Sequence, residues 1–200
     1  MATPIDFIII FVMSFSLNLI PFAGPSNLLI ASTAAIGLGN ADPLTLIFVG
    51  GFIALGSTLA KGVHYMVTFF ISGKLAEKRR QKLDADAAKI KRWAFLLLFV
   101  TAATPIPDEP IVISLGLMKY KPAKFFVAYF LGKFAIGIMG AFLGGFAIDI
   151  FGDFMSSEAI IAISIVLTVI FTIILLKVDI SKLAEKYLRR KPKTDQEKTK

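Results

Sequence analysis

Four ionisable side chains lie within apolar stretches of this sequence and carry most of its potential chemistry. Asp108 and Glu109 are adjacent, while Lys61 and Lys133 are the two basic residues outside three basic stretches. An ionised group in the middle of a bilayer costs roughly 2.5–3.5 kcal/mol on insertion scales, so such groups are usually functional. A buried ammonium group binds a phosphate or pairs with a carboxylate.

The adjacent carboxyl groups allow two compatible interpretations. A low dielectric and a like-charged neighbour both favour the protonated form of a carboxyl group, as a proton relay requires. Alternatively, Asp108 or Glu109 caps the helix that begins at Ile111, where the first N–H groups and the helix dipole favour negative charge. We weigh the relay and the cap equally.

The basic residues have a structural alternative, which is to extend toward the membrane interface. His64 lies one turn after Lys61 and is the only histidine. Extension to the interface is harder for Lys133, because a long apolar run separates it from Lys124 in the nearest basic stretch.

The sequence contains few of the residues and motifs that enzymatic catalysis uses. It has no cysteine and one histidine, which removes thiolate chemistry and argues against a histidine-rich metal site. It also lacks a Walker loop, a glycine-rich dinucleotide motif and a plausible Ser-His-Asp set. We therefore expect no enzymatic activity, no cofactor and no metal.

The composition is typical of an integral membrane protein. Of its 200 residues, 56% are hydrophobic, and the mean hydropathy is +0.75, above that of a soluble domain. A net charge of +8 would favour nucleic acid in a soluble protein. Here the cations flank apolar stretches, where they orient the chain and contact anionic lipid, so we expect no nucleic-acid partner.

The distribution of charge predicts a topology. The positive-inside rule places the three basic stretches in the cytoplasm; they are Ser72–Arg92, Lys119–Lys124 and Lys177–Lys200. The other connections, 1–6, 39–43 and 149–158, hold acids but no Lys or Arg, so they are expected outside. The chain is therefore expected in the plasma membrane, with its N-terminus outside and its C-terminus in the cytoplasm.

Three apolar stretches join opposite sides and are long enough to cross a hydrocarbon core of roughly 30 Å. They are Leu44–Ile71, Phe125–Ile148 and Ala159–Leu176. Two further stretches, 7–38 and 93–118, begin and end on one side, and each contains a break that cannot continue a helix. The residues of the two breaks are Pro21, Gly24 and Pro25, and Pro105, Pro107 and Pro110. We interpret both stretches as re-entrant hairpins; proline-kinked spanning helices are the alternative, but they conflict with the orientation rule.

The two halves share an order of features, in which Gly37 and Pro43 correspond to Gly116 and Pro122. Because the halves enter from opposite sides, the repeat is inverted, as in many transporters. The predicted fold is an all-α integral membrane protein with two opposed re-entrant hairpins and three transmembrane helices. Its parts are residues 1–71, a connector 72–92, residues 93–176 and a basic tail 177–200.

The connector and tail have their own predictions. The connector has loosely helical apolar spacing and is expected as an amphipathic helix on the inner membrane surface or as a solvated loop. The tail is expected to be disordered from about Lys191. Small residues in the crossings, among them Gly56, Gly140 and Gly144, predict close helix packing.

The stretch Pro105-Ile106-Pro107-Asp108-Glu109-Pro110, followed by Leu115-Gly116-Leu117 and the 125–144 crossing, resembles the DedA family, also called the VTT or SNARE-associated Golgi protein family. Residues 21–25 resemble the family's first re-entrant loop. The resemblance implies opposed re-entrant hairpins and translocation of lipids or lipid carriers, with proton-dependent physiology in bacterial members. The arginines of the bacterial pattern fall on Ala102 and Asp108 here, and its first-loop acid falls on Asn27.

These observations predict a transporter that moves an anionic lipid or a polyprenyl-phosphate carrier across the bilayer. Its expected site residues are Lys61, Lys133, Asp108, Glu109, Asn27 and His64. The alternatives are a proton- or cation-coupled transporter of a small solute and a non-transporting membrane organiser. The expected partners are membrane lipids, the anionic substrate and protons, and a homo-oligomer remains open.

Overall fold

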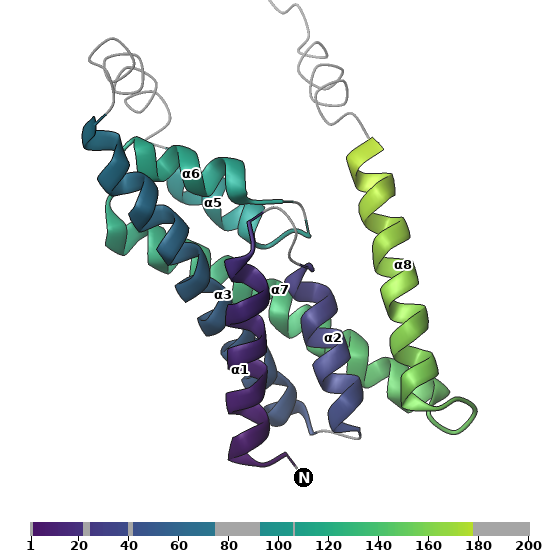
Figure 1. Cartoon of the computed structure of the whole chain (residues 1–200). Coiled ribbons are helices and arrows are strands. Elements are labelled where there is room, and N and C mark those ends of the chain that lie inside the picture. The colour runs from purple at the N-terminus through teal and green to yellow at the C-terminus, as the bar shows by residue number, and fades with distance from the viewer. Residues whose placement is uncertain (1, 22–24, 40–41, 75–92, 106, 178–200) are drawn as a thin grey trace, which may run out of the picture.

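The computed structural model describes residues 2–21, 25–39, 42–74, 93–105 and 107–177, which fold entirely as helices and their connections (Figure 1). The helices are α1 (Pro4–Leu19), α2 (Asn27–Leu38), α3 (Pro43–Ile71), the 3-10 turn η1 (Ser72–Lys74), α5 (Ala94–Ala102), α6 (Glu109–Leu117), α7 (Pro122–Phe151) and α8 (Ser157–Lys177). The all-α prediction is thus confirmed for the described residues. The connector was predicted for residues 72–92, of which 75–92 lie outside the described residues, and the disorder predicted from about Lys191 lies wholly outside them.

Two helices, α3 and α7, are long and apolar enough to cross a membrane by length and composition. They contain 29 and 30 residues, which at 1.5 Å per residue is about 45 Å. Both begin at a proline of the predicted repeat, Pro43 and Pro122. Proline suits the first helical turn, where its missing N–H has no intrahelical partner and its fixed φ is already helical. The bounds of α8 also match the third predicted crossing.

The four shorter helices lie on either side of the two predicted breaks. α1 ends at Leu19 and α2 begins at Asn27, while α5 ends at Ala102 and α6 begins at Glu109. Helices α5 and α6 have nine residues each, about 14 Å, which is too short to cross a bilayer. The prediction that the second arm begins at Ile111 was wrong by two residues, because Pro110 fits within the first helical turn.

Each long helix packs mainly against one short helix from its own half of the chain and one from the other half. α3 packs against α1 and α6, and α7 packs against α5 and α2, while α3 and α7 also pack against each other. In Figure 1, α1 and α2 lie toward one end of this pair and α5 and α6 toward the other. The two halves are therefore interlocked around the α3–α7 contact.

Glycines permit this close packing, as the sequence predicts. A Cβ atom on Gly140 would lie 2.5 Å from the carbonyl oxygen of Leu28, and one on Gly144 would lie 2.3 Å from that of Ser32. Both contacts join α7 to the backbone of α2. On α3, a Cβ on Gly56 would lie 2.6 Å from the carbonyl oxygen of Phe11 in α1. Larger residues at these positions would separate the helices.

The last helix is attached at only one end. Ile160 near the start of α8 packs with Ile36 of α2 and Ile148 of α7, and Figure 1 shows the far end of α8 standing away from the other helices. Large apolar side chains are exposed on α8, among them Val166 and Leu167. This surface suits contact with lipid.

Candidate functional site

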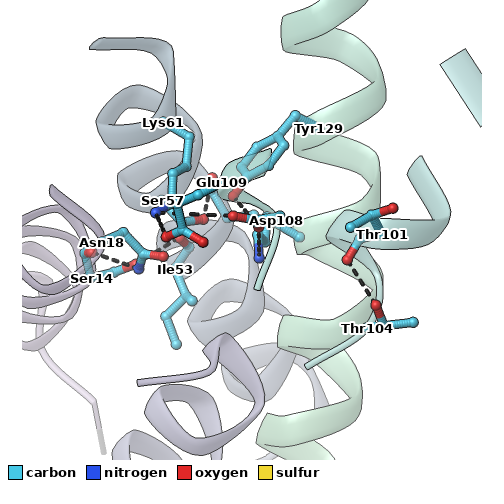
Figure 2. Close-up of polar contacts among 12 residues, drawn as sticks. Ser14, Asn18, Ile53, Ser57, Lys61, Thr101, Thr104, Asp108, Glu109 and Tyr129 are labelled. Carbon is cyan, nitrogen blue, oxygen red and sulfur yellow. Dashed lines mark hydrogen bonds and ion pairs between the residues drawn. The ribbon is translucent and has the colours of Figure 1, made fainter. Parts of the chain in front are cut away.

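The structure brings four of the predicted site residues together. Lys61 lies on α3, and Asp108 and Glu109 lie at the end of the second break and the start of α6 (Figure 2). Lys133 comes from α7. The break between α5 and α6 thus places its two acids between the two long helices.

Each acid is paired with one lysine. The Nζ atom of Lys61 lies 2.5 Å from Oε1 of Glu109, and Nζ of Lys133 lies 2.7 Å from Oδ2 of Asp108. The second oxygen of Asp108 lies 4.0 Å from Nζ of Lys61. Asp108 therefore lies between the two ammonium groups and connects α3 to α7. The sequence allows three arrangements of these lysines, which are phosphate binding, extension to the membrane interface and pairing with a carboxylate; the structure shows the pairing.

Tyr129 completes the site, although we did not predict it. Its hydroxyl donates a hydrogen bond of 2.6 Å to Oδ2 of Asp108, the same oxygen that Lys133 binds. Nζ of Lys133 also lies 5.2 Å from the centre of the Tyr129 ring, within the range of a cation–π contact. The signal was in the sequence, because Tyr129 precedes Lys133 by four residues and so shares its helix face.

We call these five residues the ion-pair cluster: Lys61, Asp108, Glu109, Tyr129 and Lys133. Their exposed fractions are 3%, 4%, 6%, 0% and 5%, respectively. Two ammonium groups and two carboxylates sum to no net charge, which lowers the cost of burying them. Removing any one charge would leave its partner buried without full compensation.

Of the two acids predicted to cap this helix, Asp108 does not do so in the structure. Asp108 does occupy the N-cap position of α6, but its side chain accepts no hydrogen bond from the first turn of that helix. Its oxygens instead face Lys133, Tyr129 and Lys61. An ammonium group adds the attraction of a full positive charge to its hydrogen bond with a buried carboxylate, which the backbone N–H groups at a helix end do not.

His64 does not join the cluster but connects its helix to the first break. The Nε2 atom of His64 lies 3.0 Å from the carbonyl oxygen of Leu19, the last residue of α1. Lys61, three residues earlier on α3, holds Glu109 at the second break. Three residues rise about 4.5 Å along a helix, so the first break begins and the second break ends at nearly the same level of α3.

Asn27 is buried at the start of α2, at an exposed fraction of 2%, and makes no contact with the cluster that the structure shows. Of the break prolines, Pro21, Pro107 and Pro110 are exposed, while Pro25 and Pro105 are partly buried. Gly24 lies outside the described residues. The prolines therefore shape the two breaks rather than line the cluster.

Two further buried polar residues on α1 escaped prediction. The hydroxyl of Ser14 donates to the carbonyl oxygen of Ile53 at 2.9 Å, and Nδ2 of Asn18 donates to the carbonyl oxygen of Ser14 at 2.8 Å. Figure 2 shows both residues on the α1 side of Ser57 and Lys61. Ser14 and Asn18 lie one turn apart and therefore on one face of α1. They extend the buried polar residues of α3, Ser57 and Lys61, toward the end of α1.

Among the described residues, no group of three His, Cys, Asp or Glu side chains has the arrangement needed to hold a metal ion. The charged groups of the cluster pair with one another. No protein-family model, no curated protein and no solved structure matches this chain.

Proposed function

We propose that this chain is a membrane transporter of DedA type that moves the phosphate headgroup of an anionic lipid, or of a polyprenyl-phosphate carrier, between the two leaflets. One observation carries the proposal: two ammonium–carboxylate pairs are buried where a helix break meets two long apolar helices. Ionisable residues inside a membrane are costly and typically mark the path of a substrate or a proton.

The proposal includes two opposed re-entrant hairpins related by an inverted repeat. Its support is the interlocked packing, in which the first short helix of each half lies on its own long helix and the second lies on the long helix of the other half. A two-fold axis in the membrane plane generates this exchange, and transporters with inverted repeats place their sites at broken helices near such an axis.

A substrate phosphate would change the charge balance of the cluster. The four charges already cancel, so an added anion raises the electrostatic energy of a low-dielectric site. If Asp108 or Glu109 takes up a proton, its lysine partner becomes available to a phosphate oxygen, and the site remains neutral. We therefore propose that proton uptake accompanies phosphate binding.

A second candidate is a proton- or cation-coupled transporter of a small solute. The adjacency of Asp108 and Glu109 favours it, because both carboxylates lie on one side of the break and can hold a proton or cation when a lysine moves away. In that case the lysines serve as internal counter-ions and no phosphate enters the site.

Reconstituted vesicles separate these functions. We expect vesicles that contain only this protein to move a fluorescent phosphatidylglycerol between leaflets, and we expect Lys133→Met to abolish most of that movement. Lys124→Met is the matched control, because Lys124 lies on the same helix but is exposed.

Failure of the wild-type chain to move any anionic lipid, in vesicles where it is folded, would contradict the proposal. Solute uptake driven by a pH gradient under the same conditions would support the second candidate. If neither movement occurs, the non-transporting organiser remains.

A further inference from the structure

Asn27 presents a buried amide group that lacks a partner. It is the first residue of α2, and its side chain is 2% exposed. Within the described part of the chain, neither Nδ2 nor Oδ1 of Asn27 has a hydrogen-bond partner. Buried polar groups in native proteins are nearly always paired, so an unpaired amide indicates a bound water, ion or ligand.

The amide lies at a helix end that favours negative charge. The first N–H groups of a helix have no acceptor within it, and they carry the positive end of the helix dipole. Ser26 caps one of them, since its hydroxyl oxygen accepts from the N–H of Leu29 at 3.4 Å. The first turn of α2, which the structure describes in full, holds no acidic residue that would neutralise the dipole.

We propose that Asn27 and the N-terminus of α2 bind the phosphate of a ligand that also carries a hydroxyl group. Nδ2 of Asn27 and the free N–H groups donate to phosphate oxygens, as helix N-termini do in other anion sites. Oδ1 of Asn27 accepts from the ligand's hydroxyl, because a single ligand satisfies both polar atoms of an amide when it both accepts and donates.

This inference rests on the proposed function and extends it to the first break. A phosphate with a hydroxyl belongs to a lipid headgroup such as phosphatidylglycerol or to free phosphate in its monoprotonated form. In both cases the contact lies at the start of α2, whereas the ion-pair cluster lies at the start of α6.

Thermal unfolding of the full chain in detergent tests the site. The ligands are phosphatidylglycerol, inorganic phosphate and, as the neutral comparison, phosphatidylcholine. A ligand that binds only the folded state raises the midpoint of unfolding in proportion to its affinity. We expect phosphatidylglycerol to raise the wild-type midpoint by several degrees, and phosphatidylcholine to leave it unchanged.

Asn27→Leu removes the amide while keeping a side chain that branches at Cγ, and we expect it to abolish this shift. Asn27→Asp places a negative charge at the same position and should also abolish the shift. It replaces the leucine variant in the test if that variant does not fold. Thr58→Val is the matched control, because Thr58 carries the other buried polar atom without a partner in the described residues. Its shift should equal that of the wild type.

The outcomes separate this site from the proposed function. If phosphatidylglycerol stabilises the Asn27 variants as much as the wild type, water alone satisfies the amide and this site is overturned, while lipid binding at the cluster stands. If phosphatidylglycerol stabilises neither the wild type nor any variant, both the Asn27 site and the proposed function fail. A shift with inorganic phosphate that Asn27→Leu removes assigns the site to free phosphate, whereas a shift with the lipid alone assigns it to the headgroup.

Discussion

The ammonium group of Lys133 lies 2.7 Å from Oδ2 of Asp108 and thereby joins the middle of α7 to the break before α6. The same carboxylate accepts a hydrogen bond from Tyr129 and lies 4.0 Å from the ammonium group of Lys61. Asp108 is thus the shared anion of a cluster that spans both long helices. A change in its partners would alter how α3 and α7 are held together.

The proposed topology predicts the accessibility of two exposed sites. The chain contains no cysteine, so single substitutions can be labelled without background. In cells, Ser156→Cys should react with a membrane-impermeant maleimide, whereas Lys121→Cys should react only after the membrane is opened. Reaction of position 121 from outside would mean that residues 93–118 cross the membrane, and the inner re-entrant hairpin would be wrong.

Close packing of α2 on α7 predicts that Gly144 tolerates no side chain. In Gly144→Ala the new Cβ would lie 2.3 Å from the carbonyl oxygen of Ser32, a backbone atom that cannot rotate away. Overpacking of this kind costs about 1–3 kcal/mol, measurable as a lower midpoint of unfolding in detergent.

Gly37→Ala provides the control for this packing. A Cβ at Gly37, within α2, meets nothing within 4 Å, and alanine in a helix is favoured over glycine by about 0.4–1 kcal/mol. We expect this variant to be as stable as the wild type or more so. An equal loss of stability in both variants would argue against helix contact as the cause.

Much of the fold was predictable because its signals are local in the sequence. Proline positions marked both helix breaks, and apolar length marked the long helices, whose predicted starts at Leu44 and Phe125 fall one and three residues after the observed ones. The burial of Lys61 and Lys133 also followed from their position within apolar runs. Such features depend on residues that are contiguous in the chain, so a single sequence contains them.

The pairing of elements was not predictable in the same way. That Glu109 pairs with Lys61, while Asp108 pairs with Lys133, depends on how α6 lies between α3 and α7. Adjacent acids in a sequence carry no indication of which lysine each will meet. Likewise the packing of α2 on α7 rather than mainly on α3 is set by complementary surfaces far apart in the chain.

Tyr129 should be required for both stability and transport. Tyr129→Phe removes one hydrogen bond to a buried carboxylate while preserving the ring, and bonds to charged groups contribute about 1.5–3 kcal/mol. Tyr65→Phe is the matched control, since the buried Tyr65 hydroxyl donates to the carbonyl oxygen of Tyr120, away from the cluster. We expect both variants to unfold at lower temperature but only Tyr129→Phe to slow lipid translocation. Equal translocation by the two variants would exclude a role for Tyr129 in the site.

The pair formed by Lys133 and Asp108 allows structure and transport to be separated. In Lys133→Met, the carboxylate of Asp108 remains buried and loses its nearest cation, and breaking a buried pair in this way costs about 3–5 kcal/mol. Adding Asp108→Asn removes the uncompensated charge, because an amide of the same shape still accepts from Tyr129. We therefore expect the double variant to recover most of the lost stability.

Transport should not recover with stability, because the proposed role of Lys133 is to bind the substrate phosphate once Asp108 releases it. Methionine offers no positive charge, whatever its neighbour. Unfolding in detergent and lipid translocation in vesicles, measured on the two single variants and the double variant, decide the matter. If the double variant regains both properties, Lys133 serves only as the counter-ion of Asp108, and the phosphate must bind elsewhere. If it regains stability alone, the lysine that joins α7 to Asp108 in this structure is also the one that receives the substrate.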